Sequence, residues 1–388
     1  MVLFFMKLKE RMHLMRKLTV QFLLLMMSLL LLTGCGGTES KQEGGTVPTT
    51  AQVQKQKITD LVGREVEFSV PAQRVVAIGP GALRLVTYIE GAAMMVGIEE
   101  VEKKSNPGRS YMMAYPDLKK LPSIGQGGPD TAPNEESLVS VKPDVIFVCT
   151  LVDKEKADQL QAKTGIPVVA LSYGDLATFG DNLYRSLNLI GSIIGREKRA
   201  QEVVAYLKQN ENDLGERTKG LAEGDRAKVY VGAVSMKGAR GIESTQAQYP
   251  PFKYIGAKNV ADETGKNGTV MIDKEKLISW NPDFLFLDAG GYALVTEDYQ
   301  KNPAFYQSLQ AMKNDRVYNL IPFNNYNPNI DTAFADAYYA GKVIFPEQFK
   351  DIDPIKKSDE IYQFLLGKPL YAEMAKDLGG FKKLELGK

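Results

Sequence analysis

Apolar positions along the chain follow two different spacings, and the two alternate in a regular order. Short apolar runs at residues 74–78, 145–149 and 166–173 predict buried strands, while the segments between them place apolar residues at helical spacing. Two short alternating runs on either side of Gly63 predict a hairpin before the first of these strands. Helices that lie between buried strands on this scale are typical of a parallel sheet.

After Tyr173 the pattern changes to about forty residues with apolar positions at helical spacing, and then a strand at AKVYVGAV opens a second alternating set. The order of elements in this second set matches the first. We therefore predict two similar α/β lobes, at residues 58–177 and 223–388, joined by a long linking helix at 178–222.

The two halves also share a motif, EESLVSVKPDVIFV at 135–148 and KEKLISWNPDFLFL at 274–287, with an offset of 139 residues. In each copy Pro-Asp is expected to end a short helix and lead the chain into a buried strand, because proline disfavours the helical conformation in the residue before it. This structural reason for the repeat does not require the glutamates, Glu136 and Glu275.

The N-terminal segment resembles a bacterial lipoprotein signal. A basic stretch precedes the apolar run VQFLLLMMSLLLLTGC, which is too short for a stable membrane span and places small residues directly before Cys35. The resemblance implies cleavage after residues 1–34 and a lipid on Cys35, with 35–57 as a flexible tether. The protein is then expected outside the cytoplasm, anchored to the membrane; an ordinary signal peptide and an uncleaved anchor are the alternatives.

Charge and residue usage argue against several classes of function. The net charge of +1 depends on the basic N-terminal segment, so the remaining chain is slightly acidic and gives no footprint for nucleic acid. His13, the one histidine, lies in the predicted signal, which excludes a Ser-His-Asp triad and a histidine metal site from the mature protein. Once Cys35 is lipidated, Cys149 is the one thiol left and is expected to be a small buried apolar residue.

The signal, the tether, the repeated motif and the linking helix together resemble the substrate-binding proteins of ABC importers for iron complexes and cobalamin, over about residues 58–349. The resemblance implies two doubly wound lobes joined by a long rigid helix, with the ligand cleft between them. It also implies permease docking by Glu136 and Glu275, one on each lobe, with Glu135 as a substitute for Glu136. Solvated acids at helix starts are the alternative. The expected partners are the permease and ATPase subunits, and a monomer without a cofactor is expected.

Loops beyond the carboxyl ends of the strands are expected to line the cleft. Gly79-Pro80-Gly81 begins like a dinucleotide fingerprint, but Arg84 takes the place of the third glycine, which argues against nucleotide binding. The family usually has a glutamate there, so we interpret Arg84 as an anion receptor at a helix N-terminus, or else as the partner of a neighbouring acid. Arg240 is the corresponding candidate on the second lobe, or else a solvated loop residue.

Two further loops, at 105–116 and 323–329, are rich in Tyr, Asn and Met, which offer flat apolar surface with a hydrogen-bonding tip. The predicted ligand-binding residues, although each tyrosine could equally serve packing, are Arg84, Arg109, Tyr111, Arg240, Tyr249, Tyr292, Asn324, Tyr326 and Asn327. Together they indicate a broad, amphipathic, anionic ligand, such as a metal chelate of the ferric siderophore type. Cobalamin or another corrinoid, and haem, remain open, whereas no carboxylate cluster for a bare metal ion is evident.

The rival interpretations are an exported enzyme on the same two-lobed scaffold and a membrane-tethered sensor or adhesin. The sequence has no G-x-S-x-G elbow, no Walker A motif and no clustered cysteines, which argues against the enzymes that these motifs mark. We therefore expect capture and delivery of a ligand, not catalysis.

Overall fold

The computed structural model describes residues 54–128, 131–149, 153–174, 180–235 and 238–387. They fall within one compact unit, Val53–Lys388. The predicted signal, the lipidation site Cys35 and most of the tether lie outside the described residues. In the part of the chain that is described, none of the helices combines the length and apolar character needed to cross a membrane.

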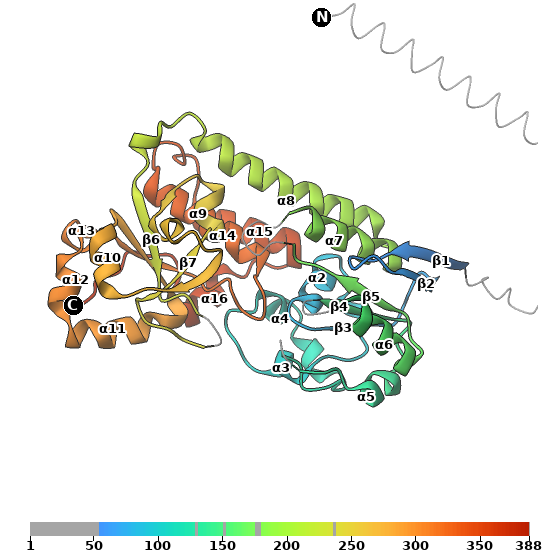
Figure 1. The fold of residues 1–388 in the computed structure, drawn as a ribbon. Coiled ribbons are helices and arrows are strands. Elements are labelled where there is room, and N and C mark those ends of the chain that lie inside the picture. Colours follow the sequence, from blue (N-terminus) through green and yellow to red (C-terminus); the bar gives the residue numbers. More distant parts are fainter. Residues whose placement is uncertain (1–53, 129–130, 150–152, 175–179, 236–237, 388) are drawn as a thin grey trace, which may run out of the picture. The chain divides into compact units, whose positions relative to one another are not determined.

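The first lobe is built on a parallel sheet of three buried strands in the order β3-β4-β5 (Figure 1). Its strands are β3 (Val75–Ile78), β4 (Val145–Cys149) and β5 (Val168–Leu171), preceded by the antiparallel hairpin of β1 (Gln54–Thr59) and β2 (Glu65–Val70). Its helices are α2 (Ala82–Tyr88), α3 (Glu100–Lys103), α4 (Ser110–Ala114), α5 (Glu135–Ser140) and α6 (Lys154–Thr164). Cys149 is fully buried, as expected for a structural cysteine.

The second lobe is built on a four-stranded parallel sheet in the order β11-β10-β6-β8, beside an antiparallel pair of β7 and β9. Its strands are β6 (Lys228–Gly232), β7 (Ser244–Ala247), β8 (Lys258–Asn259), β9 (Gly268–Met271), β10 (Phe284–Asp288) and β11 (Val317–Leu320). Its helices are α9 (Pro250–Tyr254), α10 (Lys274–Trp280), α11 (Tyr292–Lys301), α12 (Pro303–Ser308) and α13 (Gln310–Lys313). Thus β3-β4-β5 and β6-β10-β11 repeat one strand order, as the repeated motif predicts.

The repeated motif has the same local structure in both lobes. Asn134 and Asp273 cap α5 and α10 by accepting from the main-chain N–H three residues on, at 2.9 and 2.7 Å. Each motif then reaches its proline through a residue in the left-handed region, Lys142 with φ 47° and Asn281 with φ 45°. The helix therefore ends where the motif predicts, because the residue before proline leaves the right-handed helical conformation.

The aspartate that follows each proline fastens its strand to the neighbouring strand. Asp144 accepts from the main-chain N–H of Arg74 at 2.9 Å, at the start of β3, and Asp283 accepts from that of Lys228 at 2.8 Å, at the start of β6. These bonds satisfy main-chain donors that the sheet leaves unpaired at its edge. The fold therefore explains why both copies of the motif contain Pro-Asp, but these contacts do not explain the glutamates that the copies share.

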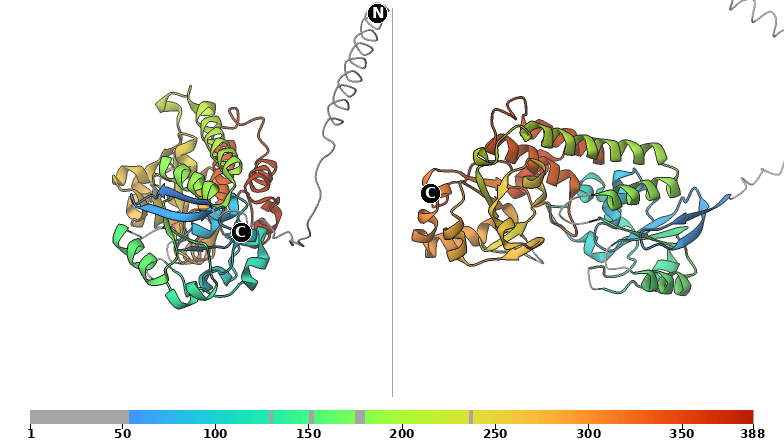
Figure 2. Two further views of the ribbon diagram at one scale, coloured as in Figure 1. Left: turned by 90° about the vertical axis from the view of Figure 1, so that its right-hand side faces the viewer. Right: turned by 45° about the horizontal axis from the view of Figure 1, so that its top comes forward.

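The region predicted as one linking helix consists of two, α7 (Asp181–Ile194) and α8 (Glu197–Thr218). They are separated at Gly195, whose φ of 69° closes α7 as a left-handed C-cap. α7 packs against α2 in the first lobe, and α8, about 33 Å long at 1.5 Å per residue, runs on to the second lobe (Figures 1 and 2). The connection between lobes therefore rests on α8, not on one continuous helix.

α8 does not join the lobes alone, because C-terminal helices lie beside it. These are α14 (Ile330–Ile344) and α15 (Pro354–Leu366). The helix that follows them, α16 (Tyr371–Leu378), packs on α15. Tyr338 on α14 donates to Asn210 on α8 at 3.1 Å, and Phe364 on α15 stacks on Tyr206 of α8 with ring centroids 3.9 Å apart. One hydrophobic core continues from the first sheet through these helices to the second lobe. Since separating the lobes would disrupt this core, we expect the movement between them to be small.

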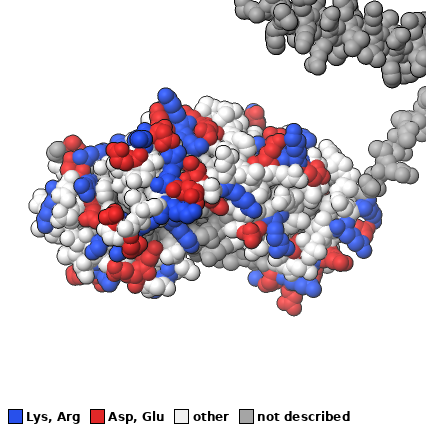
Figure 3. Space-filling view, turned by 90° about the horizontal axis from the view of Figure 1, so that it is seen from above, with Lys and Arg blue, Asp and Glu red and all other residues white. Residues whose placement is uncertain are grey.

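Charged side chains do not form a surface of one sign on the face seen in Figure 3, where acidic and basic residues are interspersed. This distribution agrees with the near-zero net charge of the chain.

Candidate functional site

A cavity of about 360 Å³ lies where the loops of both lobes meet. The segment that links β11 to α14, residues 322–329, forms part of its wall, and we call this segment the strap. The described residues that line the cavity are Asn106, Pro107, Gly108, Ser235, Gly238, Ala239, Gly290, Pro322, Asn324, Asn325, Tyr326 and Leu378. Its position beyond the carboxyl ends of β6 and β10 is where open α/β sheets bind ligands.

None of the described lining residues carries a charge. Their polar groups are carboxamides, a hydroxyl, a phenol and main-chain groups at glycines, all of which recognise a ligand through hydrogen bonds. In the part of the chain that is described, no three His, Cys, Asp or Glu side chains come together as a metal-binding group. Over the described residues, the chemistry of this wall is therefore neutral hydrogen bonding.

Arg84 lies beneath the strap, fully buried on α2. Its guanidinium donates to the carbonyl oxygens of Asn325 at 2.7 Å and Pro328 at 3.0 Å, and to the hydroxyl of Tyr173 at 3.0 Å. It also lies over the ring of Tyr111, 4.7 Å from the centroid. Arg84 does not line the cavity in this structure, because strap carbonyls already hold the guanidinium that was expected to face the cleft.

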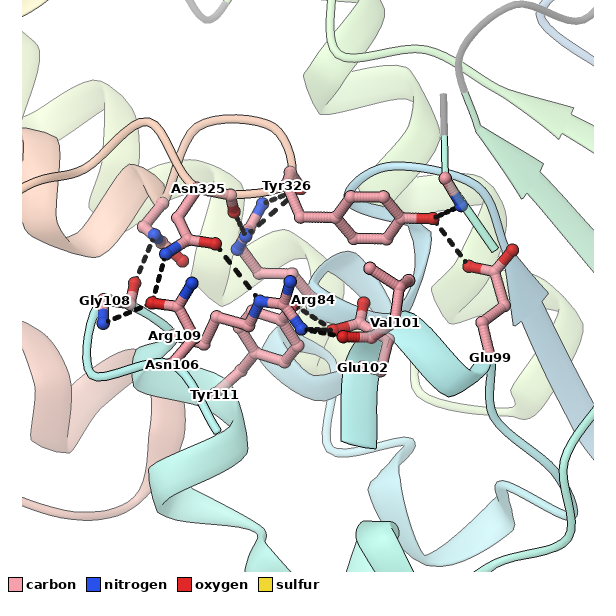
Figure 4. A network of polar contacts seen from close by, with 12 residues as sticks. Arg84, Glu99, Val101, Glu102, Asn106, Gly108, Arg109, Tyr111, Asn325 and Tyr326 are labelled. Carbon is pink, nitrogen blue, oxygen red and sulfur yellow. Dashed lines mark hydrogen bonds and ion pairs between the residues drawn. The ribbon is translucent and has the colours of Figure 1, made fainter. Parts of the chain in front are cut away.

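Arg109 and Tyr111 belong to the same buried layer (Figure 4). Arg109 forms an ion pair with Glu102 at 3.2 Å and donates from Nε to the side-chain oxygen of Asn325 at 3.2 Å. Tyr111 donates to the same Glu102 oxygen at 2.6 Å. Burial raises the pKa of Glu102, while Arg109 and the Tyr111 hydroxyl act to lower it. The two predicted residues therefore support the strap from below, and neither lines the cavity.

Glu99 fastens the tip of the strap to the first lobe, although the sequence did not single it out. Its carboxylate accepts from the Tyr326 hydroxyl at 3.0 Å and from the Gly79 N–H at 3.1 Å, and the Tyr326 hydroxyl accepts from the Gly128 N–H at 2.8 Å (Figure 4). Gly79 is required there, since a Cβ atom would lie 2.3 Å from the Cys149 carbonyl oxygen. Burial raises the pKa of Glu99 to about 7, against the lowering effect of these bonds.

The strap itself is bent at Tyr326 and Asn327, whose φ angles of 51° and 73° lie in the left-handed region. Such residues are strained unless their surroundings hold them, and they are concentrated at functional sites. Here Asn327 donates to the Pro80 carbonyl at 3.1 Å, and the Tyr326 ring lies under Arg109, 5.4 Å from its guanidinium carbon. Of the three predicted strap residues, Asn324 and Tyr326 line the cavity and Asn327 does not.

The predicted residues of the second lobe lie outside the cavity wall. Tyr249 is buried and packs against Phe252 and Phe323, with ring centroids 4.9 and 5.3 Å away. Tyr292 is half-buried at the start of α11, against the core of the lobe, and Arg240 is exposed. Tyr249 therefore serves packing, the alternative to ligand binding that the sequence left open for each tyrosine.

Two buried acids of the second lobe hold the loops next to the cavity. Asp288, at the end of β10, accepts from the Gly290 N–H at 2.8 Å, and Asp336, on α14, accepts from the Ile321 N–H at 3.2 Å. Burial raises the pKa of Asp288 to about 7 and raises the pKa of Asp336 well above its usual range. They position Gly290 and the start of the strap.

The predicted docking acids occupy equivalent places on the two lobes. Glu136 lies in the first turn of α5 and Glu275 in the first turn of α10, and both are exposed. Glu135 instead forms an ion pair with Lys163 at 3.1 Å. One turn after each docking acid stands an exposed aliphatic residue, Val139 at 45% and Ile278 at 46% exposure. The geometry thus favours Glu136 over its substitute.

Comparison with known proteins places this fold among solute receptors. A family model described as periplasmic binding protein matches residues 75–322. The molybdate-binding protein MolA of Haemophilus influenzae is 24% identical over 79% of this chain and 89% of its own. The structure of MolA bound to molybdate superposes with a TM-score of 0.65, at 22% identity, over 81% of this chain and 98% of that one.

Two relatives from Bacillus subtilis cover similar lengths. The ABC transporter substrate-binding lipoprotein YvrC, itself uncharacterized, is 23% identical over 84% of this chain and 97% of its own length. An iron-uptake system-binding protein is 23% identical over 78% of this chain and 90% of its own. At these identities the solved structures establish the fold alone.

Proposed function

Because this chain belongs to the periplasmic binding protein family, we propose that it is the extracytoplasmic substrate-binding lipoprotein of an ABC importer, anchored through Cys35. It captures an anionic metal complex and delivers it to the permease. The observation that carries this proposal is the cavity between the two lobes, walled by neutral hydrogen-bonding groups and backed by two buried arginines.

The layer beneath the strap indicates the charge of the ligand. Arg84 and Arg109 lie directly behind Asn325. Glu102 balances the charge of Arg109, whereas Arg84 donates to neutral groups, the Tyr173 hydroxyl and strap carbonyls. Inside a protein, where the effective dielectric constant is low, a cation such as Arg84 acts over a longer range than in water. A ligand with negative charge and oxygen acceptors therefore suits this wall better than a cation does.

The size of the cavity bears on which anionic complex is bound. A ferric siderophore-type chelate is the candidate that the sequence indicates. At about 360 Å³ the cavity lies at the lower end of the range for ligand pockets, which favours a compact ligand. Molybdate, the ligand of MolA, is accordingly the second candidate. Cobalamin, haem and the larger ferric siderophores would need the lobes to open further, so a ferric chelate at this site has to be a compact one.

Delivery depends on docking, for which we propose Glu136 and Glu275 as the acids that meet the permease. They are exposed, they stand in equivalent helical turns of the two lobes, and each has an exposed aliphatic residue beside it. Two equivalent acids on similar lobes suit a partner with two similar subunits, each presenting a cationic side chain.

Changing both acids, Glu136→Gln and Glu275→Gln, should lower ligand-stimulated ATP hydrolysis of the reconstituted importer by at least tenfold, while ligand affinity of the free protein stays within twofold. Hydrolysis should fall because the variant lacks the two charges proposed to meet the permease. Ligand affinity should stay because both side chains are exposed and lie outside the cavity. Glu135→Gln is the matched control, since Glu135 is already paired with Lys163. A double variant that stimulates hydrolysis like the unchanged protein would remove the docking assignment.

A further inference from the structure

The polar groups of the cavity wall divide into those with partners inside the protein and those without. Asn325 uses both ends of its carboxamide: its oxygen accepts from Arg109 at 3.2 Å, and its nitrogen donates to the Asn106 side-chain oxygen at 2.5 Å. The Tyr326 hydroxyl donates to Glu99 and accepts from the Gly128 N–H. Although these two side chains line the cavity, their hydrogen-bonding capacity is directed into the protein.

Three other groups on the wall are in the opposite situation. The carboxamide of Asn324, the hydroxyl of Ser235 and the side-chain nitrogen of Asn106 have no hydrogen-bond partner among the described residues. All three residues are half-buried, so these groups remain accessible from the cavity. Their capacity is considerable, since an amide nitrogen donates two hydrogen bonds and a hydroxyl donates one.

The three groups come from three different segments. Asn106 lies in the turn before α4, Ser235 follows β6 in the second lobe, and Asn324 belongs to the strap. Ser235 stands beside Gly290, where a Cβ atom would lie 2.6 Å from its hydroxyl oxygen. A ligand that bonds to all three therefore contacts both lobes and the strap at once.

The buried arginines determine where the strap presents Asn324. The Arg84 fork holds the carbonyls of Asn325 and Pro328, the two sides of the bend that follows Asn324. The strap also packs so closely on the first lobe that a Cβ atom at Gly108 would lie 2.9 Å from the Asn325 side-chain nitrogen. Lysine cannot replace this fork, because a single ammonium lacks the planar arrangement of donors.

We propose that Asn106, Ser235 and Asn324 are the groups that bind the ligand's oxygen atoms, and that Arg84 is a positioning residue that holds the strap without touching the ligand. This inference rests on the proposed capture function. It assigns the ligand class as an oxygen-rich anion, a metal oxyanion or the oxygen-coordinated iron of a chelate, bound by neutral donors.

The test compares Asn324→Ala and Ser235→Ala with Arg84→Lys in calorimetric titrations. The probes are sodium molybdate and the ferric dicitrate complex, an anionic chelate in which oxygen atoms coordinate the iron. Asn324→Ala and Ser235→Ala should each lower, by about tenfold, the affinity for the probe that the unchanged protein binds, which corresponds to the loss of one strong hydrogen bond. Their thermal midpoints and the hydrogen exchange of the amides of 323–329 should equal those of the unchanged protein. Arg84→Lys should speed the exchange of those amides and weaken binding as a consequence.

A stricter variant is Asn106→Asp, which keeps an oxygen to accept from Asn325 but removes the two N–H donors. It should weaken an anionic probe by more than tenfold with the exchange of the strap unchanged. If the unchanged protein binds a probe and Asn324→Ala binds it equally well, the assignment is wrong while the capture function stands. If Arg84→Lys weakens binding without faster exchange of the strap, Arg84 touches the ligand and the positioning role is wrong. If the unchanged protein binds neither probe, the proposed ligand class fails and the inference fails with it.

Discussion

Replacing Arg109 with methionine should lower the free energy of unfolding at pH 8 by about 3–5 kcal/mol, the range for a buried ion pair that loses one partner. Arg109 and Glu102 are 5% and 2% exposed. The second carboxylate oxygen of Glu102 already has no hydrogen-bond partner among the described residues. Without Arg109 the carboxylate would keep the Tyr111 hydroxyl as a hydrogen-bond donor and Arg84 as a more distant cation. Urea unfolding followed by circular dichroism measures the change.

The neighbouring pair of Lys103 and Glu100, 3.1 Å apart on α3, supplies the control. Because this pair is partly exposed, Lys103→Met should change the free energy of unfolding by less than about 1 kcal/mol. Adding Glu102→Gln to Arg109→Met should restore more than half of the loss, since the uncompensated charge is then gone. Equal losses for Arg109→Met and Lys103→Met would show that the buried layer does not stabilise the strap in this way.

Replacing Glu99 with glutamine should remove a loss of folding stability that appears as the pH rises. Burial raises the pKa of Glu99 from its unfolded value of 4.5 to about 7, so between these pH values the folded protein binds more protons than the unfolded chain. The free energy of unfolding therefore falls as pH rises from about 4.5 to about 7 and stays lower above that, by about 3 kcal/mol. At pH 8, Glu99→Gln should be more stable than the unchanged protein by up to this amount.

The charged and titratable groups that face Glu99 are Glu102, which raises its pKa, Arg109, which lowers it, and the Tyr326 hydroxyl, which lowers it. A glutamine oxygen can still accept from Tyr326 and Gly79, so the strap keeps its contact.

Burial also raises the pKa of Asp288 to about 7, so its ionisation lowers the free energy of unfolding over the same pH range. Part of the slope should therefore remain in Glu99→Gln. Glu100→Gln, at the adjacent half-buried residue, should keep the slope between about pH 5 and 8, because hydrogen bonds from Ser123 and Lys103 lower the pKa of Glu100 and it titrates below this range. Urea unfolding midpoints measured from pH 4.5 to 8 give the slope of stability against pH. A slope in Glu99→Gln equal to that of the unchanged protein would exclude Glu99 as its source.

The fold could be predicted from local pattern because its elements are set by residues close in sequence. The strands at 145–149 and 168–171, the hairpin around Gly63 and the helix ends before Pro143 and Pro282 all follow from short runs and single prolines. The break between α7 and α8 was missed, although Gly195 carried the signal: a glycine after an apolar run is a frequent left-handed helix end.

The site was less predictable, because its contacts join residues far apart in the chain. Arg84 was expected to face the cleft from a helix start, yet the strap carbonyls that hold it come more than 240 residues later. Of the strap residues that the sequence indicated, Asn324 and Tyr326 line the cavity and Asn327 does not. Nothing in the sequence singled out Asn325 or indicated which carboxamides are already bonded. Ser235 and Asn106 gave no local signal, since a serine after a strand and an asparagine in a turn are common.

The most direct measurement of the capture function is native mass spectrometry of the purified protein after incubation with ferric dicitrate, molybdate, haem and cobalamin in equal amounts. We expect one anionic metal complex, molybdate or the ferric chelate class, to be retained at one per chain. Retention of none of the four, or of cobalamin alone, would contradict a compact anion site between the lobes.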